Sequence, residues 1–130
     1  MKGKVSVIVG SKSDLEIAKK AEDTLKELNI DFETKILSCH RNYKDLETYL
    51  ATSGTDIYIA IAGLAAHLPG YIAARTKKPV IGVPVNKAIG GFDALLSIVQ
   101  MPKGVPVACV GIDNAENAAL LAHRILELKK

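Results

Sequence analysis

Short runs of almost uninterrupted apolar residues are the feature that most constrains the fold of this chain. The clearest are Val5 to Val9, Ile57 to Ala62 and Val80 to Val83, and each is followed by Gly or Pro. Such short runs, rich in β-branched residues, are typical of strands buried on both faces. Between them lie longer segments with apolar residues three or four positions apart, the spacing of amphipathic helices. This alternation predicts an α/β fold, a three-layer doubly wound parallel sheet with about five strand–helix units.

The predicted strands and helices alternate along the whole chain. Strands are expected from Val5 to Val9, Phe32 to Leu37, Ile57 to Ala62, Val80 to Val83 and Val105 to Val110. Helices are expected from Ser13 to Asn29, Tyr43 to Ala51, Leu68 to Arg75, Phe92 to Val99 and Ala115 to Leu128. A capping box from Ser13 to Glu16 is expected to open the first helix, and Pro84 is expected to end the fourth strand.

Composition narrows the class of protein further. The chain has 130 residues, 48% of them hydrophobic, so we expect one domain over residues 1–130 with a core of its own. No apolar run reaches about 18 residues, and Met1 leads directly into a strand pattern, so neither a membrane span nor a signal peptide is expected. We therefore expect a cytoplasmic protein without a membrane partner. The net charge of +3 is too small to indicate nucleic acid and suits a small anionic ligand.

Unusual residues gather in the loops that follow the predicted strands. A sheet of this class places its ligand beyond the carboxyl ends of its strands. The loops at 10–14, 38–41, 63–70 and 84–91 all occupy that position. We therefore expect the functional site at this edge of the sheet.

The first of these loops, Gly10 to Asp14, has the features of an anion site. Free N–H groups at a helix start, together with the hydroxyls of Ser11 and Ser13, could bind phosphate oxygens. The spacing matches neither a Walker A loop nor the dinucleotide fingerprint. A purely structural role, with Ser13 as a helix cap and Ser11 in a turn, explains the loop equally well.

The second loop, Ser38-Cys39-His40-Arg41, places a histidine beside an arginine. An imidazole exchanges a proton near neutral pH, and a guanidinium can hold a phosphate or carboxylate with two hydrogen bonds. A histidine and an arginine that are adjacent in sequence usually form a surface pair with no specific role. Here their position at the ligand-binding edge of the sheet favours a functional role. Cys39 is interpreted as a small loop residue, because no second histidine or other base besides His40 is placed near it in the sequence.

The third loop, Gly63 to Gly70, consists of small residues around His67. Small side chains let a backbone close over a flat ligand and offer it N–H groups. His67 could contact that ligand, but a bond to the backbone at the helix start is the favoured interpretation. A response regulator is disfavoured, because glycine, serine and alanine replace the acidic residues that it needs after its first and third strands. The scattered aspartates also predict no metal site.

These segments, taken in order, resemble one family, the class I N5-carboxyaminoimidazole ribonucleotide mutases of purine biosynthesis (the PurE family). Each block is weak alone, but together they span essentially the whole chain. The matching blocks are Gly10 to Asp14, Ser38 to Arg41, Ala65 to Gly70, Gly82 to Val85, Leu96 to Pro102, Gly104 to Val107 and Asn117 to Ala122.

The resemblance implies a flavodoxin-like fold, a homo-oligomer that is commonly an octamer, and a reaction without metal or other cofactor. In the family, a carboxylate moves from an exocyclic nitrogen of an aminoimidazole ribonucleotide to ring carbon C4. His40 falls on the family's proton-transfer histidine. By the same likeness, the ribonucleotide lies against Ser11, Ser13, Asp14, Ser38, Arg41, Gly63, Leu64, Ala65 and Leu68.

The sequence departs from the family pattern in two of these loops, and the shorter third loop keeps an alternative reaction open. The loop before His67 is two residues shorter than in common bacterial members, and Asn42-Tyr43 replaces Thr-Pro. One alternative is a direct carboxylase that adds free carbon dioxide to aminoimidazole ribonucleotide. A more remote one is a non-catalytic module that binds a phosphorylated ligand.

Overall fold

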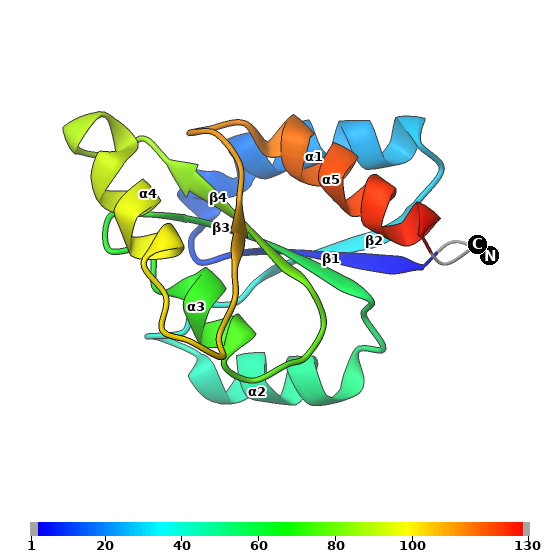
Figure 1. Cartoon of the computed structure of the whole chain (residues 1–130), viewed down its shortest axis with the longest axis horizontal. Coiled ribbons are helices and arrows are strands. Elements are labelled where there is room, and N and C mark those ends of the chain that lie inside the picture. Colours follow the sequence, from blue (N-terminus) through cyan, green and yellow to red (C-terminus); the bar gives the residue numbers. More distant parts are fainter. Residues whose placement is uncertain (1–2, 129–130) are drawn as a thin grey trace.

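The computed structural model describes residues 3–128, so residues 1–2 and 129–130 of the predicted domain lie outside the described part. Five parallel strands form one sheet in the order β2-β1-β3-β4-β5 (Figure 1). The strands are β1 Lys4–Val9, β2 Asp31–Ile36, β3 Ile57–Gly63, β4 Val80–Val85 and β5 Ala108–Cys109. This is the flavodoxin-like order of a doubly wound sheet, as the sequence predicts.

Helices cover both faces of the sheet. The helices are α1 Leu15–Glu27, α2 Tyr43–Thr52, α3 Leu68–Ala73, α4 Phe92–Val99 and α5 Ala115–Glu127, with short 3₁₀ turns η1 Lys12–Asp14 and η2 Ile89–Gly91. In Figure 1, α1 and α5 lie on one side of the sheet, and α2 and α3 lie on the other. The buried residues of α4 pack in the same hydrophobic cluster as those of α2 and α3. The three-layer arrangement is therefore confirmed.

Side chains along each strand point alternately to the two faces of the sheet, so the core consists of two hydrophobic clusters, one on each face. Val5, Val7 and Val9 of β1 pack with α1 and α5, whereas Ile8 packs with α2, α3 and α4. Successive strand side chains point to opposite faces, so a strand covered on both sides must be apolar at nearly every position. Leu25 of α1 is fully buried, and such burial stabilises the fold by about 1.5–3 kcal/mol.

The fourth and fifth strands differ from the prediction, and in both cases the position of a proline explains why. The β4 strand continues through Pro84 to Val85. The carbonyl oxygen of Pro84 accepts a hydrogen bond from Asp113 N, which lies on the β5 side of β4. The N–H that proline lacks would point to the same side, and the β4–β5 pairing ends before Pro84, so no sheet hydrogen bond is lost. The β5 strand contains only two residues instead of Val105 to Val110. Pro106 lies two residues before Ala108, so in an extended strand its backbone would face β4 as that of Ala108 does. Proline has no N–H to donate there, and the pairing with β4 does not extend to it.

Two helix boundaries also differ from the prediction. The predicted capping box is wrong, because the chain first forms η1 and α1 begins only at Leu15, with no side-chain cap bond from Asp14. The α3 helix ends at Ala73, two residues before the predicted Arg75, while Pro69 lies in its first turn as expected.

The strand order fixes where a ligand can bind. β1 pairs with β2 on one side and with β3 on the other, so the chain reverses its direction across the sheet between β1 and β3. At such a switch point the loops after neighbouring strands diverge and leave a crevice at the carboxyl edge. In the part of the chain that the structure describes, no helix has the length and apolar character needed to cross a membrane.

Candidate active site

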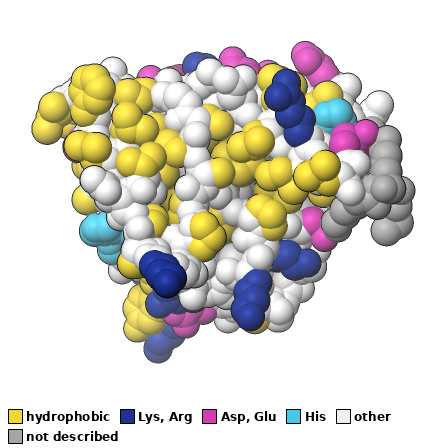
Figure 2. Space-filling view, viewed as in Figure 1, with side chains coloured by type: hydrophobic (Ala, Val, Ile, Leu, Met, Phe, Trp, Pro, Cys, Tyr) yellow, Lys and Arg dark blue, Asp and Glu magenta, His cyan; other side chains and the backbone are white. Residues whose placement is uncertain are grey.

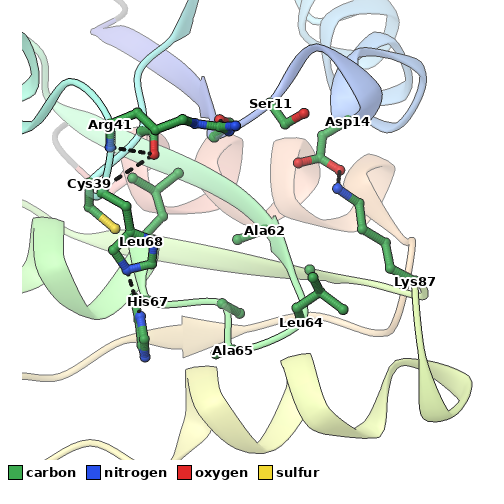
Figure 3. Close-up of a pocket in the computed structure, with 15 residues that line it drawn as sticks. Ser11, Asp14, Cys39, Arg41, Ala62, Leu64, Ala65, His67, Leu68 and Lys87 are labelled. Carbon is green, nitrogen blue, oxygen red and sulfur yellow. Dashed lines mark hydrogen bonds and ion pairs between the residues drawn. The ribbon is translucent and has the colours of Figure 1, made fainter.

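A cavity of about 300 Å³ opens at the carboxyl ends of β1, β2 and β3 (Figure 3). All the sequence-predicted site residues line it except Ser13, which lies beside it. The lining residues are Gly10, Ser11, Asp14, Ser38, Cys39, His40, Arg41, Ala62, Gly63, Leu64, Ala65, Ala66, His67, Leu68 and Lys87. The rule that ligands bind beyond the strand ends therefore brings together residues up to 77 positions apart (Gly10 to Lys87).

The loop after β1 is organised by its two serines. Ser11 is the N-cap of η1, and its Oγ accepts a hydrogen bond of 3.3 Å from Ser13 N and lies 3.0 Å from Ser13 Oγ. Ser13 does not cap α1; instead its hydroxyl faces a cation from another loop. Because α1 begins immediately afterwards, its positive end and these hydroxyls lie together at one side of the cavity.

That cation is Lys87, from the loop after β4, which the sequence analysis did not single out. Its Nζ lies 2.9 Å from Asp14 Oδ1 and 2.9 Å from Ser13 Oγ. The Asp14 side chain is only 3% exposed, so Lys87 neutralises a carboxylate that is otherwise removed from water. In the sequence, the only indication of this contact is that Lys87 lies in a loop at the same edge of the sheet as the predicted anion site.

Gly63 makes room for this lysine. A Cβ at residue 63 would lie 2.8 Å from Lys87 Cδ and 3.1 Å from its Cγ, so a larger residue there would force the lysine stem to move. The aliphatic stem of Lys87 therefore crosses the third loop directly against the Gly63 backbone. This contact explains how a residue after β4 reaches the start of α1.

The loop after β2 is held by Ser38, whose side chain is nearly buried. Its Oγ accepts hydrogen bonds from His40 N at 3.1 Å and Arg41 N at 3.2 Å. Asn42 completes the turn, because its Oδ1 accepts a 2.6 Å bond from Ser38 N. The departure at residue 42 from the resembled pattern thus has a local structural role. The turn fixes the backbone from which the His40 and Arg41 side chains extend.

Arg41 connects the second loop to the first. Its Nη2 donates a 2.8 Å hydrogen bond to the carbonyl oxygen of Gly10. A guanidinium has five N–H donors, so this bond leaves donors that can bind an anion at the cavity edge. The observed contact aims Arg41 toward the same space as the Ser11 hydroxyl (Figure 3).

His40 and His67 form a hydrogen-bonded pair. The distance from His40 Nε2 to His67 Nδ1 is 2.9 Å, and the rings meet edge to face at 88°. The expected cap role of His67 is wrong, since it stands at the N-cap position of α3 without a side-chain cap bond. One ring must donate and the other accept, so the contact couples their tautomers. The pair can therefore position a proton at the cavity.

The third loop carries backbone strain. Leu64 and Ala66 have φ angles of 55° and 25°, in the left-handed region that non-glycine residues seldom adopt. A hydrogen bond of 3.0 Å from Ala66 N to the Gly63 carbonyl holds the turn. Such strain costs about 1–3 kcal/mol per residue and is concentrated at functional sites.

Cys39 and the acidic residues add no further reactive group. Burial raises the pKa of the Cys39 thiol, which keeps it protonated near neutral pH, in agreement with its interpretation as a loop residue. Within residues 3–128, no group of three His, Cys, Asp or Glu side chains is arranged to hold a metal ion.

The fold and the cavity define a doubly wound, flavodoxin-like α/β protein with its candidate site at the topological switch point. The model of the AIR carboxylase family matches residues 4–130, and the chain belongs to this family. It is 56% identical to a Methanocaldococcus jannaschii protein, covering 96% of this chain and 80% of that protein. It is 54% identical to a Pyrococcus abyssi protein, with coverages of 97% and 75%. Both relatives are named N5-carboxyaminoimidazole ribonucleotide mutase.

A solved structure supports the same assignment. A Ser-to-Asp form of Treponema denticola PurE2 matches with a TM-score of 0.90 and 31% identity, covering 100% of this chain and 83% of that one. The resemblance drawn from the sequence motifs is therefore confirmed.

Proposed function

We propose that this chain is an N5-carboxyaminoimidazole ribonucleotide mutase of purine biosynthesis. It would move a carboxyl group from the exocyclic nitrogen to ring carbon C4 of one ribonucleotide. The names of its relatives support this reaction. The observation that carries it in the structure is one cavity that joins the His40–His67 pair to an anion cradle, which consists of Ser11, Ser13, the start of α1 and Arg41.

In this proposal the cradle binds the ribonucleotide by its phosphate end. Ser11, Ser13 and the start of α1 supply neutral donors, and Arg41 supplies a charged one. Asp14 and Ser38 lie close to the ribose. The strained loop at Gly63, Leu64, Ala65 and Leu68 covers the imidazole and the migrating carboxyl group.

The proposed chemistry needs one proton carrier. His40 protonates the exocyclic nitrogen, the carbamate C–N bond breaks, and carbon dioxide leaves. Ring carbon C4 then attacks the carbon dioxide to form a C–C bond, and His40 takes back the C4 proton. Both fragments stay in the cavity at a high effective concentration, so the reaction as proposed requires no cofactor. His67, at 2.9 Å, positions the His40 ring for both transfers.

The first prediction separates the mutase from its alternatives. Purified protein should convert N5-carboxyaminoimidazole ribonucleotide to the C4-carboxylated product at a rate that added bicarbonate does not change, because the carboxyl group comes from the substrate. The measurement compares this ribonucleotide with aminoimidazole ribonucleotide, each with and without bicarbonate. Turnover only of aminoimidazole ribonucleotide with bicarbonate would instead identify a direct carboxylase. Binding without any turnover would leave a phospholigand-binding module.

A homo-oligomer, an octamer by family resemblance, is part of the proposal. One face of the η2–α4 segment is apolar and open to solvent, and Figure 2 shows hydrophobic side chains gathered at this corner. Ile89, Phe92 and Leu96 are 76%, 59% and 55% exposed. Exposed apolar patches of this kind commonly mark protein–protein contacts.

The second prediction tests that assembly. Leu96→Glu should convert the oligomer to smaller species, because a charge at the centre of the patch would have to be desolvated in the contact. Light scattering coupled to size exclusion gives the mass, and circular dichroism checks that the smaller species stays folded, as expected because Leu96 is 55% exposed in the single chain. A wild-type mass of a single 13.9 kDa chain would refute the oligomer.

Domain extent and location complete the proposal. Residues 1–130 are taken as one domain, supported by a single sheet between the two hydrophobic clusters. A cytoplasmic location is proposed because the substrate is a phosphorylated metabolic intermediate and because Cys39 and Cys109 are free thiols in the fold.

A further inference from the structure

Lys87 stands at the anion cradle without a role in the function proposed above. It is the only lysine among the cavity-lining residues of the described chain, and its side chain is 29% exposed. Its ammonium group has three N–H donors; Ser13 Oγ accepts one of them, and the group also forms an ion pair with Asp14 Oδ1. Figure 3 shows it extending along one side of the cavity toward Asp14, near Ser11.

Lys87 determines the net charge of the cavity lining. The charged lining residues are Arg41, Lys87 and Asp14, which together give a formal charge of +1. Without Lys87 the positive charge of Arg41 would be balanced by the buried carboxylate of Asp14. A phosphate monoester, with up to two negative charges, would then meet an uncompensated carboxylate beside its site.

We propose that Lys87 is a specificity residue that binds the phosphate group of the ribonucleotide directly, as the second cation of the cradle. The proposal rests on the proposed function for the identity of the ribonucleotide, but the cradle itself can be tested with phosphate alone. Its hydrogen bond to Ser13 Oγ places the ammonium group beside the Ser11 and Ser13 hydroxyls, where the phosphate is expected. A cation on a flexible stem can turn from Ser13 to a phosphate oxygen while it keeps Asp14 neutralised.

The contact with Gly63 supports a selected position rather than a chance surface ion pair. The lysine stem packs against the Gly63 backbone, in space that a Cβ at residue 63 would share, so this glycine leaves room for the observed path of the side chain. The cradle thereby draws on three separate loops, after β1, β2 and β4. A phosphate that contacts all three would also hold the cavity in one arrangement.

The test uses inorganic phosphate and isothermal titration calorimetry on the full chain. Lys87→Met keeps the aliphatic stem and removes the charge, and we expect phosphate affinity to fall by about tenfold or more, as charge-assisted hydrogen bonds usually contribute. Lys19→Met is the matched control, since Lys19 pairs with Asp23 on the outer surface of α1. It should bind phosphate like the wild type. Equal affinity in Lys87→Met and wild type, or no saturable phosphate binding by the wild type, would overturn the proposal.

A double variant separates direct contact from neutralisation of Asp14. Asp14→Asn combined with Lys87→Met restores the formal charge of +1 of the cavity lining. It also leaves no buried carboxylate without a counter-charge, so this variant should fold even if Lys87→Met alone is unstable. If Lys87 contacts phosphate, this variant should regain only part of the lost affinity, because the repelling carboxylate is gone but the direct contact is not restored, and it should stay clearly weaker than the wild type. Recovery of wild-type affinity would show that Lys87 acts only through Asp14 and would overturn the proposal.

Turnover distinguishes this inference from the proposed function. If the function holds, Lys87→Met should raise KM for the ribonucleotide while kcat stays within about threefold, because the phosphate is remote from the reacting atoms. Loss of phosphate affinity in a protein whose wild type turns over neither ribonucleotide would refute the mutase and leave the cradle in place.

Discussion

His40→Asn should lower the turnover of N5-carboxyaminoimidazole ribonucleotide by about 10²-fold or more, while binding stays close to that of the wild type. An amide keeps a polar side chain of similar size but can neither give nor take the proton that both half-reactions require, and general acid–base catalysis usually contributes a factor of this size. The measurement is kcat from product formation, together with the Kd of the ribonucleotide from calorimetry.

The chain offers a matched control for this substitution. His123 lies on α5, 3.7 Å from Glu127, away from the carboxyl edge of the sheet. His123→Asn removes the same chemical group and should leave kcat unchanged. If His40→Asn turned over at the wild-type rate, His40 would have no part in the proton transfer.

Arg41→Met should reduce kcat/KM by about 10- to 100-fold, mainly through KM. The substitution removes the charged donors proposed for the phosphate and also the bond to the Gly10 carbonyl that joins the first two loops. Arg41→Lys should recover only part of the loss, because an ammonium group cannot make the two parallel bonds of a guanidinium.

Arg124→Met is the corresponding control, since Arg124 lies in the last turn of α5. Its kinetic constants should match those of the wild type. An unchanged KM in Arg41→Met would remove Arg41 from the cradle and place the phosphate elsewhere.

Most of the fold can be predicted from hydrophobic patterning. Strands buried on both faces leave a strong signal, as in Val5 to Val9, and the strand–helix alternation then permits few topologies. The edges of the sheet are less predictable. Whether Pro84 can stay inside a strand, or Pro106 can shorten one, depends on the direction in which each missing N–H would point, and this is known only once the register is known.

The site is predictable to the extent that strand ends determine it. The first three loops converge because parallel strands end at one edge, which needs no side-chain detail. Two other contacts could not be predicted in this way. Lys87 contacts Ser13, 74 positions away in the sequence, and His67 contacts His40, 27 positions away. Such pairs depend on side-chain reach across loops, as with the lysine stem over Gly63, and local sequence carries no sign of them.

The central claim is that one ribonucleotide spans the cradle of Ser11 and Ser13 and the imidazole of His40. The most direct measurement is a crystal structure of His40→Asn with N5-carboxyaminoimidazole ribonucleotide bound, since this variant should hold the substrate without consuming it. We expect the phosphate within hydrogen-bond distance of both serines and the carboxylated imidazole ring against residue 40. A phosphate bound outside the first loop, or a ring turned away from residue 40, would contradict the account.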